Sequence, residues 1–193
     1  MSNFPNKQFQ GRLYTFGHLQ PAQMKVPLNA QGNLAIDMHV TFGCHCFTEE
    51  FDVLVHQPDH RYTYKGEQRA FDTLRYECSL HLPRLMQALL QGKIYNADES
   101  YTYAAHITLA SLQGPQSYSI FFNLEKNKQA RVPAVRMFVK SAYLKPLVAK
   151  PNAQNWRFSS LAGQIAGVFP PKTKKPKPAK KKKKAPQGLF PAS

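Results

Sequence analysis

The fold class of this chain follows from residues 118–144, which read Tyr118-Ser-Ile-Phe-Phe-Asn-Leu-Glu-Lys-Asn-Lys-Gln-Ala-Arg-Val-Pro-Ala-Val-Arg-Met-Phe-Val-Lys-Ser-Ala-Tyr-Leu144. In residues 118–125 and 134–144, alternate positions are apolar, and the polar segment 127–133 separates these two runs. The positions expected on the buried side are Ile120, Phe122 and Leu124, then Val135, Met137, Val139, Ser141 and Tyr143. A period of two is typical of strands with one buried face, so we predict two antiparallel strands joined by a turn.

The region before this stretch adds a strand and a helix. Residues 100–110 alternate in the same way, which predicts a third strand. Upstream of it, apolar residues recur every three or four positions, and Pro83 suits a first helical turn. We therefore expect a helix over 82–91 that ends at Gly92, followed by a three-stranded antiparallel meander.

The remaining segments complete a mixed fold. Alternation predicts a half-buried strand over 34–42, and a short strand follows at 61–64. A short amphipathic helix is expected near the end of the folded region, with Phe158, Leu161, Ile165 and Val168 on its apolar face. The sequence predicts an α+β domain over 34–169, preceded by an irregular arm over 1–33.

Residues 170–193 form a tail rich in lysine and proline. The chain has 193 residues and a net charge of +15, and the tail holds nine lysines and no acidic residue. A run of like charges cannot bury itself, so we expect this tail to be disordered and to attract an anionic partner. The lysines expected to meet phosphates are Lys172, Lys174, Lys175, Lys177, Lys180, Lys181, Lys182, Lys183 and Lys184.

The composition and the absence of known motifs argue against several classes of protein. No stretch has the roughly 18 to 20 continuous apolar residues of a membrane helix, and the first residues lack the apolar core of a signal peptide. We expect a cytoplasmic protein whose three cysteines stay reduced. The sequence contains no phosphate-cradling glycine loop, no Gly-x-Ser-x-Gly and no His-Glu-x-x-His, so nucleotide hydrolysis, serine-hydrolase and zinc-protease chemistry lack support.

The predicted meander leaves one face for other side chains. By the period of two, this face carries aromatic rings, cations and a histidine: Thr102, His106, Thr108, Phe121, Asn123, Glu125, Arg136, Phe138 and Lys140. Bases stack on exposed rings while Arg and Lys meet phosphates, so Phe121, Arg136, Phe138 and Lys140 are the predicted nucleic-acid-binding residues. The alternative is that the C-terminal helix covers Phe121 and Phe138 as ordinary core residues.

A topological resemblance accompanies this face. A helix followed by an antiparallel meander with a basic last strand, over Phe71 to Leu144, resembles the small ribonucleases of the barnase and colicin type and the messenger-RNA-cleaving toxins of bacterial toxin–antitoxin pairs. The phrase Phe138-Val-Lys-Ser-Ala-Tyr143 is similar to a segment of uncharacterised proteins carried on bacterial mobile elements. The ribonuclease resemblance implies a metal-independent endoribonuclease with His106, Glu125, Arg136 and Lys140 as catalytic candidates.

One group of residues resembles a metal site. Cys44, Cys46, His56 and His60 offer thiolate and imidazole ligands that suit a structural zinc ion, and His-x3-His is a usual spacing. Cys-x-Cys is tighter than the usual pair, so ordinary strand-end residues are the alternative. Cys78 lies in an apolar stripe and is expected to be a packing residue.

Three hypotheses follow for the function. The first is a non-enzymatic nucleic-acid-binding protein that uses the sheet face for local contacts and the lysine tail for phosphate attraction. The second is the metal-independent ribonuclease, which would need no cofactor. The third is a protein-interaction module or inhibitor that a mobile element encodes. The residues do not distinguish RNA from DNA, and binding to a membrane surface ranks last because the sequence has no apolar anchor.

Overall fold

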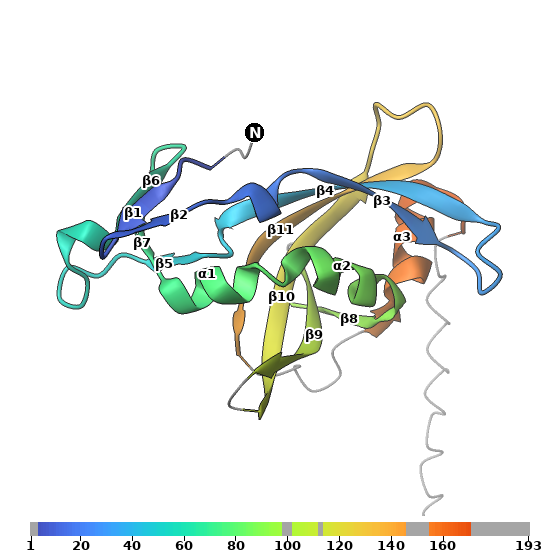
Figure 1. The fold of residues 1–193 in the computed structure, drawn as a ribbon. Coiled ribbons are helices and arrows are strands. Elements are labelled where there is room, and N and C mark those ends of the chain that lie inside the picture. The colour runs from blue at the N-terminus through green and yellow to red at the C-terminus, as the bar shows by residue number, and fades with distance from the viewer. Residues whose placement is uncertain (1–3, 98–101, 112–113, 146–154, 171–193) are drawn as a thin grey trace, which may run out of the picture.

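A seven-stranded sheet forms the centre of the molecule (Figure 1). The computed structural model describes residues 4–97, 102–111, 114–145 and 155–170. The strands lie in the order β12-β8-β9-β10-β11-β4-β3, and all neighbours are antiparallel except β11 and β4, which are parallel. Their bounds are β3 Ala22–Pro27, β4 Ala35–His45, β8 Lys93–Asn96, β9 Thr102–Ser111, β10 Gly114–Lys126, β11 Ala134–Leu144 and β12 Asn155–Arg157.

Within the described ranges, three α-helices pack on one face of this sheet. They are α1 Thr73–Ser79, α2 Leu82–Gln91 and α3 Phe158–Ala166, and they contact β11, β9 and β10 respectively. Helix α2 has the predicted bounds and its C-cap is Gly92, and α3 is the predicted amphipathic helix. The α+β class is therefore confirmed.

The N-terminal segment differs from the expected irregular arm. It contains β1 Lys7–Phe9, β2 Arg12–Tyr14, the 3-10 turn η1 Gly17–Leu19 and β3. Its aromatic residues are buried against a second sheet of order β5-β7-β6, with bounds β5 Thr48–Glu50, β6 Arg61–Tyr64 and β7 Glu67–Phe71. Phe16, for example, packs on Phe47 with ring centroids 4.1 Å apart. The prediction of an irregular arm was wrong. Strands β1 and β2 have three residues each and are too short to show alternation, whereas β3 does alternate, with Ala22, Met24 and Val26 on one side.

A β-bulge corrects the assignment of two residues in β11. The register of β11 against β10 shifts between Phe121, which pairs with Ser141, and Phe122, which pairs with Val139, so Lys140 is one extra residue in β11. Ala142 is buried opposite the buried Ile120, and the next residue, Tyr143, stacks on Phe121 with centroids 5.5 Å apart. The prediction that Ser141 and Tyr143 lie on the buried side was wrong, because the bulge turns them to the opposite face.

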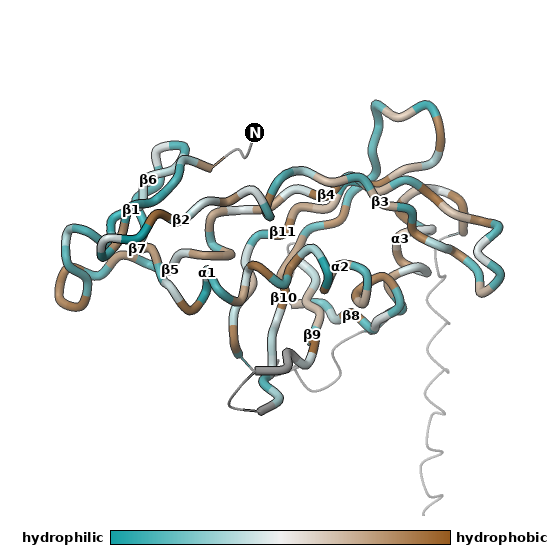
Figure 2. Tube along the Cα trace, in the orientation of Figure 1, coloured by the Kyte–Doolittle hydropathy of each residue, from teal (hydrophilic) through white to brown (hydrophobic). Residues whose placement is uncertain are grey.

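An exposed apolar turn follows β5. Val53, Leu54 and Val55 are 76%, 91% and 69% exposed, and Figure 2 shows their apolar colour in the loop at the left end of the molecule. Asp52 accepts hydrogen bonds within this turn from the backbone N–H groups of Leu54 and His56. The turn lies far along the chain from the strands of the predicted binding face and provides a useful control position.

Candidate nucleic-acid interface

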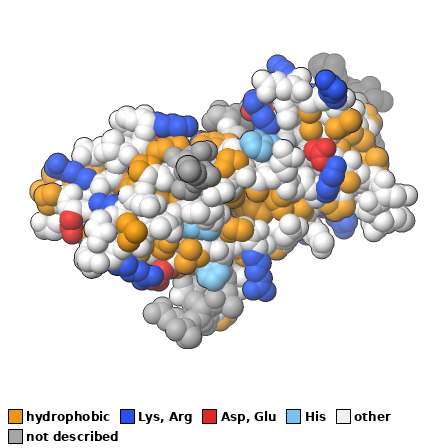
Figure 3. All heavy atoms as spheres, turned by 45° about the horizontal axis from the view of Figure 1, so that its top comes forward, with side chains coloured by type: hydrophobic (Ala, Val, Ile, Leu, Met, Phe, Trp, Pro, Cys, Tyr) orange, Lys and Arg blue, Asp and Glu red, His pale blue; other side chains and the backbone are white. Residues whose placement is uncertain are grey.

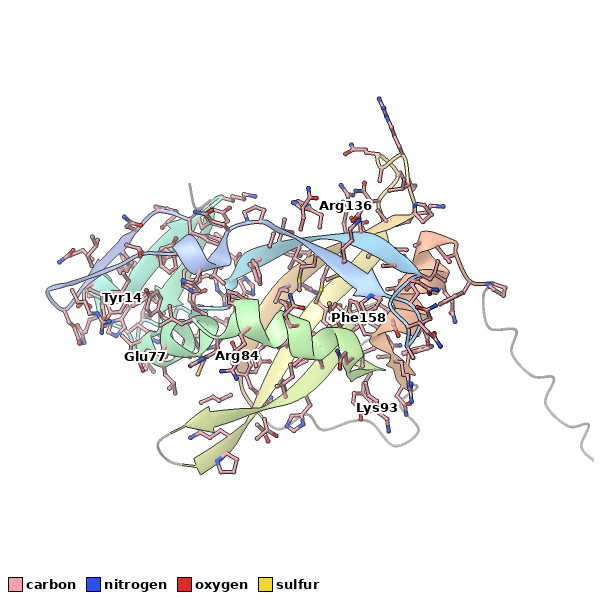
Figure 4. The ribbon with its side chains drawn as sticks, turned by 45° about the vertical axis from the view of Figure 1, so that its right-hand side comes forward. Tyr14, Glu77, Arg84, Lys93, Arg136 and Phe158 are labelled. Atoms are coloured by element: carbon pink, nitrogen blue, oxygen red, sulfur yellow. The ribbon has the colours of Figure 1, made fainter. Side chains whose placement is uncertain are left out.

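Among the described residues, the three helices cover one face of the seven-stranded sheet and leave the other open. Figure 4 shows Arg136 on the side of the sheet away from Phe158 and helix α2. Alternation separates the two faces, because Phe122 and Met137 are buried toward the helices while Asn123, Arg136 and Phe138 point to the opposite side. We call this second side the open face, defined by His39 and Thr41 of β4, Phe121, Asn123 and Glu125 of β10, Arg136, Phe138 and Lys140 of β11, and Thr102 and His106 of β9.

A hollow of about 440 Å³ lies in the open face over β10, β11 and β4. It is lined by His39, Thr41, Asn123, Glu125, Arg136, Met137 and Phe138. The strand pairing explains this gathering, because Arg136 is opposite His39 on one side and opposite Glu125 on the other. Residues nearly a hundred positions apart in the sequence thus share one site.

Asn123 gives the hollow an unsatisfied hydrogen-bond acceptor. Its Oδ1 atom is buried and has no hydrogen-bond partner in the described part of the chain. A buried polar atom without a partner is costly, at roughly 1–3 kcal/mol, so such atoms in native proteins often await a ligand or water. Beside it, Phe138 is 44% exposed, which is high for a large apolar ring. The hollow therefore offers an exposed ring to a ligand with a flat face, and Asn123 would accept a hydrogen bond from that ligand once its side chain turns toward the hollow.

The cations of the open face have different neighbours. Arg136 Nη2 donates to Glu125 Oε1 at 2.8 Å, and both side chains remain largely exposed. Lys140 Nζ lies 3.5 Å from Thr102 Oγ1, so the amine reaches across β10 toward β9. Figure 3 brings the upper side of the molecule forward and shows Lys and Arg around its rim, with hydrophobic and His side chains between them. The face is mixed in charge, and strong nonspecific attraction would have to come from elsewhere.

The structure groups only some of the predicted site residues. Glu125, Arg136 and Phe138 line the hollow together, with Lys140 close by on the same strand. His106 is exposed on β9 opposite Ser119, two strands away from Arg136, and does not line the hollow. Phe121 is partly buried because it stacks on Tyr143, whose ring also lies under the Arg75 guanidinium at 4.9 Å. The tail lysines lie outside the described residues.

The sequence analysis did not identify His39 as a site residue. His39 lines the hollow beside Arg136, where the sequence had led us to expect His106. The alternation in residues 34–42 places His39 on the polar side of the strand. The alternation does not predict that His39 lies next to Arg136, because that contact depends on the parallel pairing of β4 with β11. Long-range strand pairing leaves no local signal in the sequence.

The four predicted zinc ligands do not form a site. Cys46 is fully buried with its Sγ 3.9 Å from the Val139 carbonyl oxygen, and burial raises the pKa of its thiol. His56 Nδ1 accepts from the Asp52 backbone N–H, and its Nε2 lies 2.9 Å from Glu49 Oε1. His60 Nδ1 likewise accepts from the Gln57 backbone N–H at 3.2 Å. These ring nitrogens hydrogen-bond within turns, and the group of ligand atoms found in the described residues contains only Cys44 of the four.

The fold and the open face define an α+β protein whose central sheet is covered by helices on one side. A family model matches residues 6–166, and the chain belongs to the YjaZ family. A comparison with curated proteins finds no match, and a comparison with solved structures finds none either. Within the described residues, no helix combines the length and apolarity that crossing a membrane requires.

Proposed function

We propose that this protein binds single-stranded nucleic acid through the hollow in the open face. The observation that carries the proposal is the buried, unpartnered Asn123 Oδ1 beside the half-exposed ring of Phe138. Unpaired bases expose amino donors and a flat ring, and proteins recognise them by stacking and by hydrogen bonds to their edges. In this proposal Phe138 stacks on a base, Asn123 accepts from its amino group, and Arg136 and Lys140 meet the flanking phosphates.

The lysine tail has a separate role in this proposal. Nine lysines attract phosphates without regard to sequence, and each phosphate contact on a single strand adds about 0.7 to the slope of log affinity against log salt. The tail supplies attraction, whereas the open face supplies the local contacts with bases. Removing residues 170–193 should therefore lower affinity and flatten the salt dependence while base preference remains.

The test measures fluorescence anisotropy of labelled single-stranded RNA and DNA with the full chain. Phe138→Ala should weaken binding about 5- to 150-fold, which corresponds to one lost stacking contact of about 1–3 kcal/mol. Leu54→Ala removes an exposed apolar side chain far from the face and should leave affinity unchanged. Arg84→Ala, on α2 and so on the helix side, is the matched control for Arg136→Ala (Figure 4). Equal affinities for Phe138→Ala and the unaltered protein would reject the proposal.

A specific observation supports a second candidate, a metal-independent ribonuclease. Glu125, His39 and Arg136 line the same hollow, and Glu125 already accepts a hydrogen bond from Arg136. Metal-free RNA cleavage needs a base that takes the 2′-hydroxyl proton, an acid that protonates the leaving 5′-oxygen, and a cation beside the phosphorane. In this alternative Glu125 takes the proton, the 2′-oxygen bonds to phosphorus, and the 5′-oxygen departs with a proton from His39. The products are a 2′,3′-cyclic phosphate and a 5′-hydroxyl.

Cleavage is tested separately from binding. A doubly labelled RNA should be cut by the unaltered protein and resist Glu125→Gln and His39→Gln, and the same RNA with 2′-deoxynucleotides should remain intact. His106→Gln, two strands away, is the matched histidine control and should retain activity. Binding without any cleavage would remove the ribonuclease candidate and leave the binding proposal standing.

A further inference from the structure

A second group of chemically active side chains lies at the joint between the two sheets. Cys44 and His45 end β4, and Glu67 begins β7. Each residue offers one ligand atom, and these three atoms lie within 4.8 Å of one another. They are the Cys44 sulfur, a His45 imidazole nitrogen and a Glu67 carboxylate oxygen. Within the described residues, no other set of three such side chains meets this condition.

The backbone fixes two of these side chains from opposite directions. The β6–β7 hairpin turns through Lys65 and Gly66, whose φ angles are 52° and 82°, and it pairs Tyr64 with Glu67. Two central residues with positive φ are typical of a tight hairpin turn, which sets the position of Glu67. On β4, the register against β11 shifts after Phe42, and His45 is again paired, with Ser141. Strand pairing and a tight hairpin turn therefore set the positions of His45 and Glu67.

Hydrogen bonds behind the three residues hold them further. Arg69 Nη1 donates to Glu67 Oε1 at 3.0 Å, and Arg69 Nε donates to Thr48 Oγ1 at 2.9 Å. Thr48 Oγ1 in turn donates to the Cys44 carbonyl oxygen at 2.8 Å. Partners of this kind orient the ligands of metal sites and are a usual part of them.

We propose that Cys44, His45 and Glu67 bind a Zn²⁺ ion. Thiolate, imidazole and carboxylate form a mixed S, N and O ligand set that suits zinc, with bonds of about 2.0–2.3 Å to a tetrahedral centre. Three protein ligands leave the fourth position open, as in zinc sites that bind a water or an exchangeable group. This set shares only Cys44 with the quartet that the sequence predicted.

The surroundings indicate what occupies the fourth position. The three residues line a hollow of about 280 Å³ together with Lys65, Lys140, Tyr64 and Phe138. Two lysines beside an open metal position favour an anionic fourth ligand, such as hydroxide or a carboxylate. The hollow thus combines a metal position with an anion-attracting wall.

The free site requires two changes before the ion can enter. His45 Nε2 and Glu67 Oε1 are hydrogen-bonded at 2.8 Å, and this bond must open. The Cys44 thiol must also lose its proton, because the thiolate is the form that binds zinc.

Cobalt is the most informative probe, because Co²⁺ follows zinc into such sites and reports its ligands by absorption. The full chain, purified without metal, should bind one Co²⁺ with near-ultraviolet thiolate-to-cobalt charge transfer and visible bands of a four-coordinate centre. Cys44→Ser should lose the charge transfer, and Zn²⁺ should displace the cobalt. Cys78→Ser, a buried thiol on α1, should keep the full spectrum.

A second variant, Glu67→Gln, is needed because Cys44 is buried and Cys44→Ser could lose the metal by misfolding. The Glu67 side chain is about half exposed, so the variant should fold, and it should bind Zn²⁺ at least about tenfold more weakly in competition with a chromogenic chelator. No charge transfer in the unaltered protein, charge transfer that persists in Cys44→Ser, or unchanged zinc affinity in Glu67→Gln would each overturn the site. None of these measurements depends on nucleic-acid binding.

Discussion

The two faces of the central sheet use the same strands for opposite purposes. Toward the helices, β10 and β11 present Phe122, Met137 and Val139, which are almost fully buried. Toward solvent, the intervening residues are Asn123, Arg136 and Phe138, which line a hollow and leave a polar acceptor unsatisfied. The difference shows that apolar packing closes one face, while the other keeps a hollow and a half-exposed aromatic ring.

The largest contrast between the faces is expected for two phenylalanines. Phe122→Ala should lower the free energy of unfolding by about 3–5 kcal/mol, because the side chain is fully buried and its loss leaves a cavity. Phe138→Ala should cost less than about 1 kcal/mol, because the ring is 44% exposed. Urea denaturation of both variants measures the difference. Similar costs would mean that Phe138 is a core residue and that the open face is ordinary surface.

A glycine beneath the open face should give the next largest effect. A Cβ at Gly43 would lie 2.8 Å from the Lys140 carbonyl oxygen and 3.2 Å from Phe138 Cζ. Gly43→Ala should therefore destabilise the fold by about 1–3 kcal/mol, since the bulged backbone must move. Gly17→Ala, where a Cβ would meet no atom within 4 Å, is the control. Equal melting temperatures for the two variants would contradict the close approach of β4 and β11.

The helix side of the sheet also holds a histidine that should make the fold sensitive to acid. His18 in η1 is hydrogen-bonded to Ser79 of α1 at 2.8 Å, and burial lowers the pKa of its imidazole. An unfolded histidine titrates near pH 6.5, so below that pH the unfolded chain binds more protons than the folded one. The free energy of unfolding should fall as pH drops through about 6.5, by at most about 1.4 kcal/mol per pH unit.

The contribution of His18 is isolated by a substitution. His18→Gln should show a shallower loss of stability between about pH 7 and pH 5 in urea denaturation. His106→Gln, which changes an exposed histidine on the open side of the sheet, should follow the unaltered protein. Parallel curves for the unaltered protein and His18→Gln would mean that the ring does not resist protonation.

The smallest effect is expected for the ion pair on the open face. Glu125→Gln removes the charge that faces Arg136 at 2.8 Å, but both groups are exposed, so stability should change by less than about 1 kcal/mol. Nucleic-acid affinity should rise, because Arg136 is released from an acid and one negative charge leaves the face. Denaturation and anisotropy on the same preparation measure both quantities. A loss of affinity would show that Glu125 contacts the ligand directly.

The parts of the fold that could be predicted are those with a local cause. The apolar spacing and Pro83 determine helix α2, and Gly92 ends it where expected. The period of two identifies which side of β10 is buried, because the strand keeps its alternation from Tyr118 to Leu124. Both signals lie within a few residues of the element that they describe.

The parts that could not be predicted depend on contacts across the chain. The parallel pairing of β4 with β11 brings His39 to Arg136, and the bulge beside Lys140 reverses the faces of Ser141 and Tyr143. The contact of His45 with Glu67 needs both the end of β4 and the β6–β7 turn. Tertiary packing decides each of these, and hydrophobic periodicity does not record it.

The most direct test of the account asks which residues touch a bound strand. A single-stranded oligonucleotide would be photo-crosslinked to the full chain, and the modified residues would be identified by mass spectrometry. We expect crosslinks within β11, at Phe138 first, and on the neighbouring residues of β10 and β4. In Phe138→Ala the crosslink at position 138 should disappear. Crosslinks confined to the lysine tail, or spread over the helix side, would contradict the assignment of the open face as the binding site.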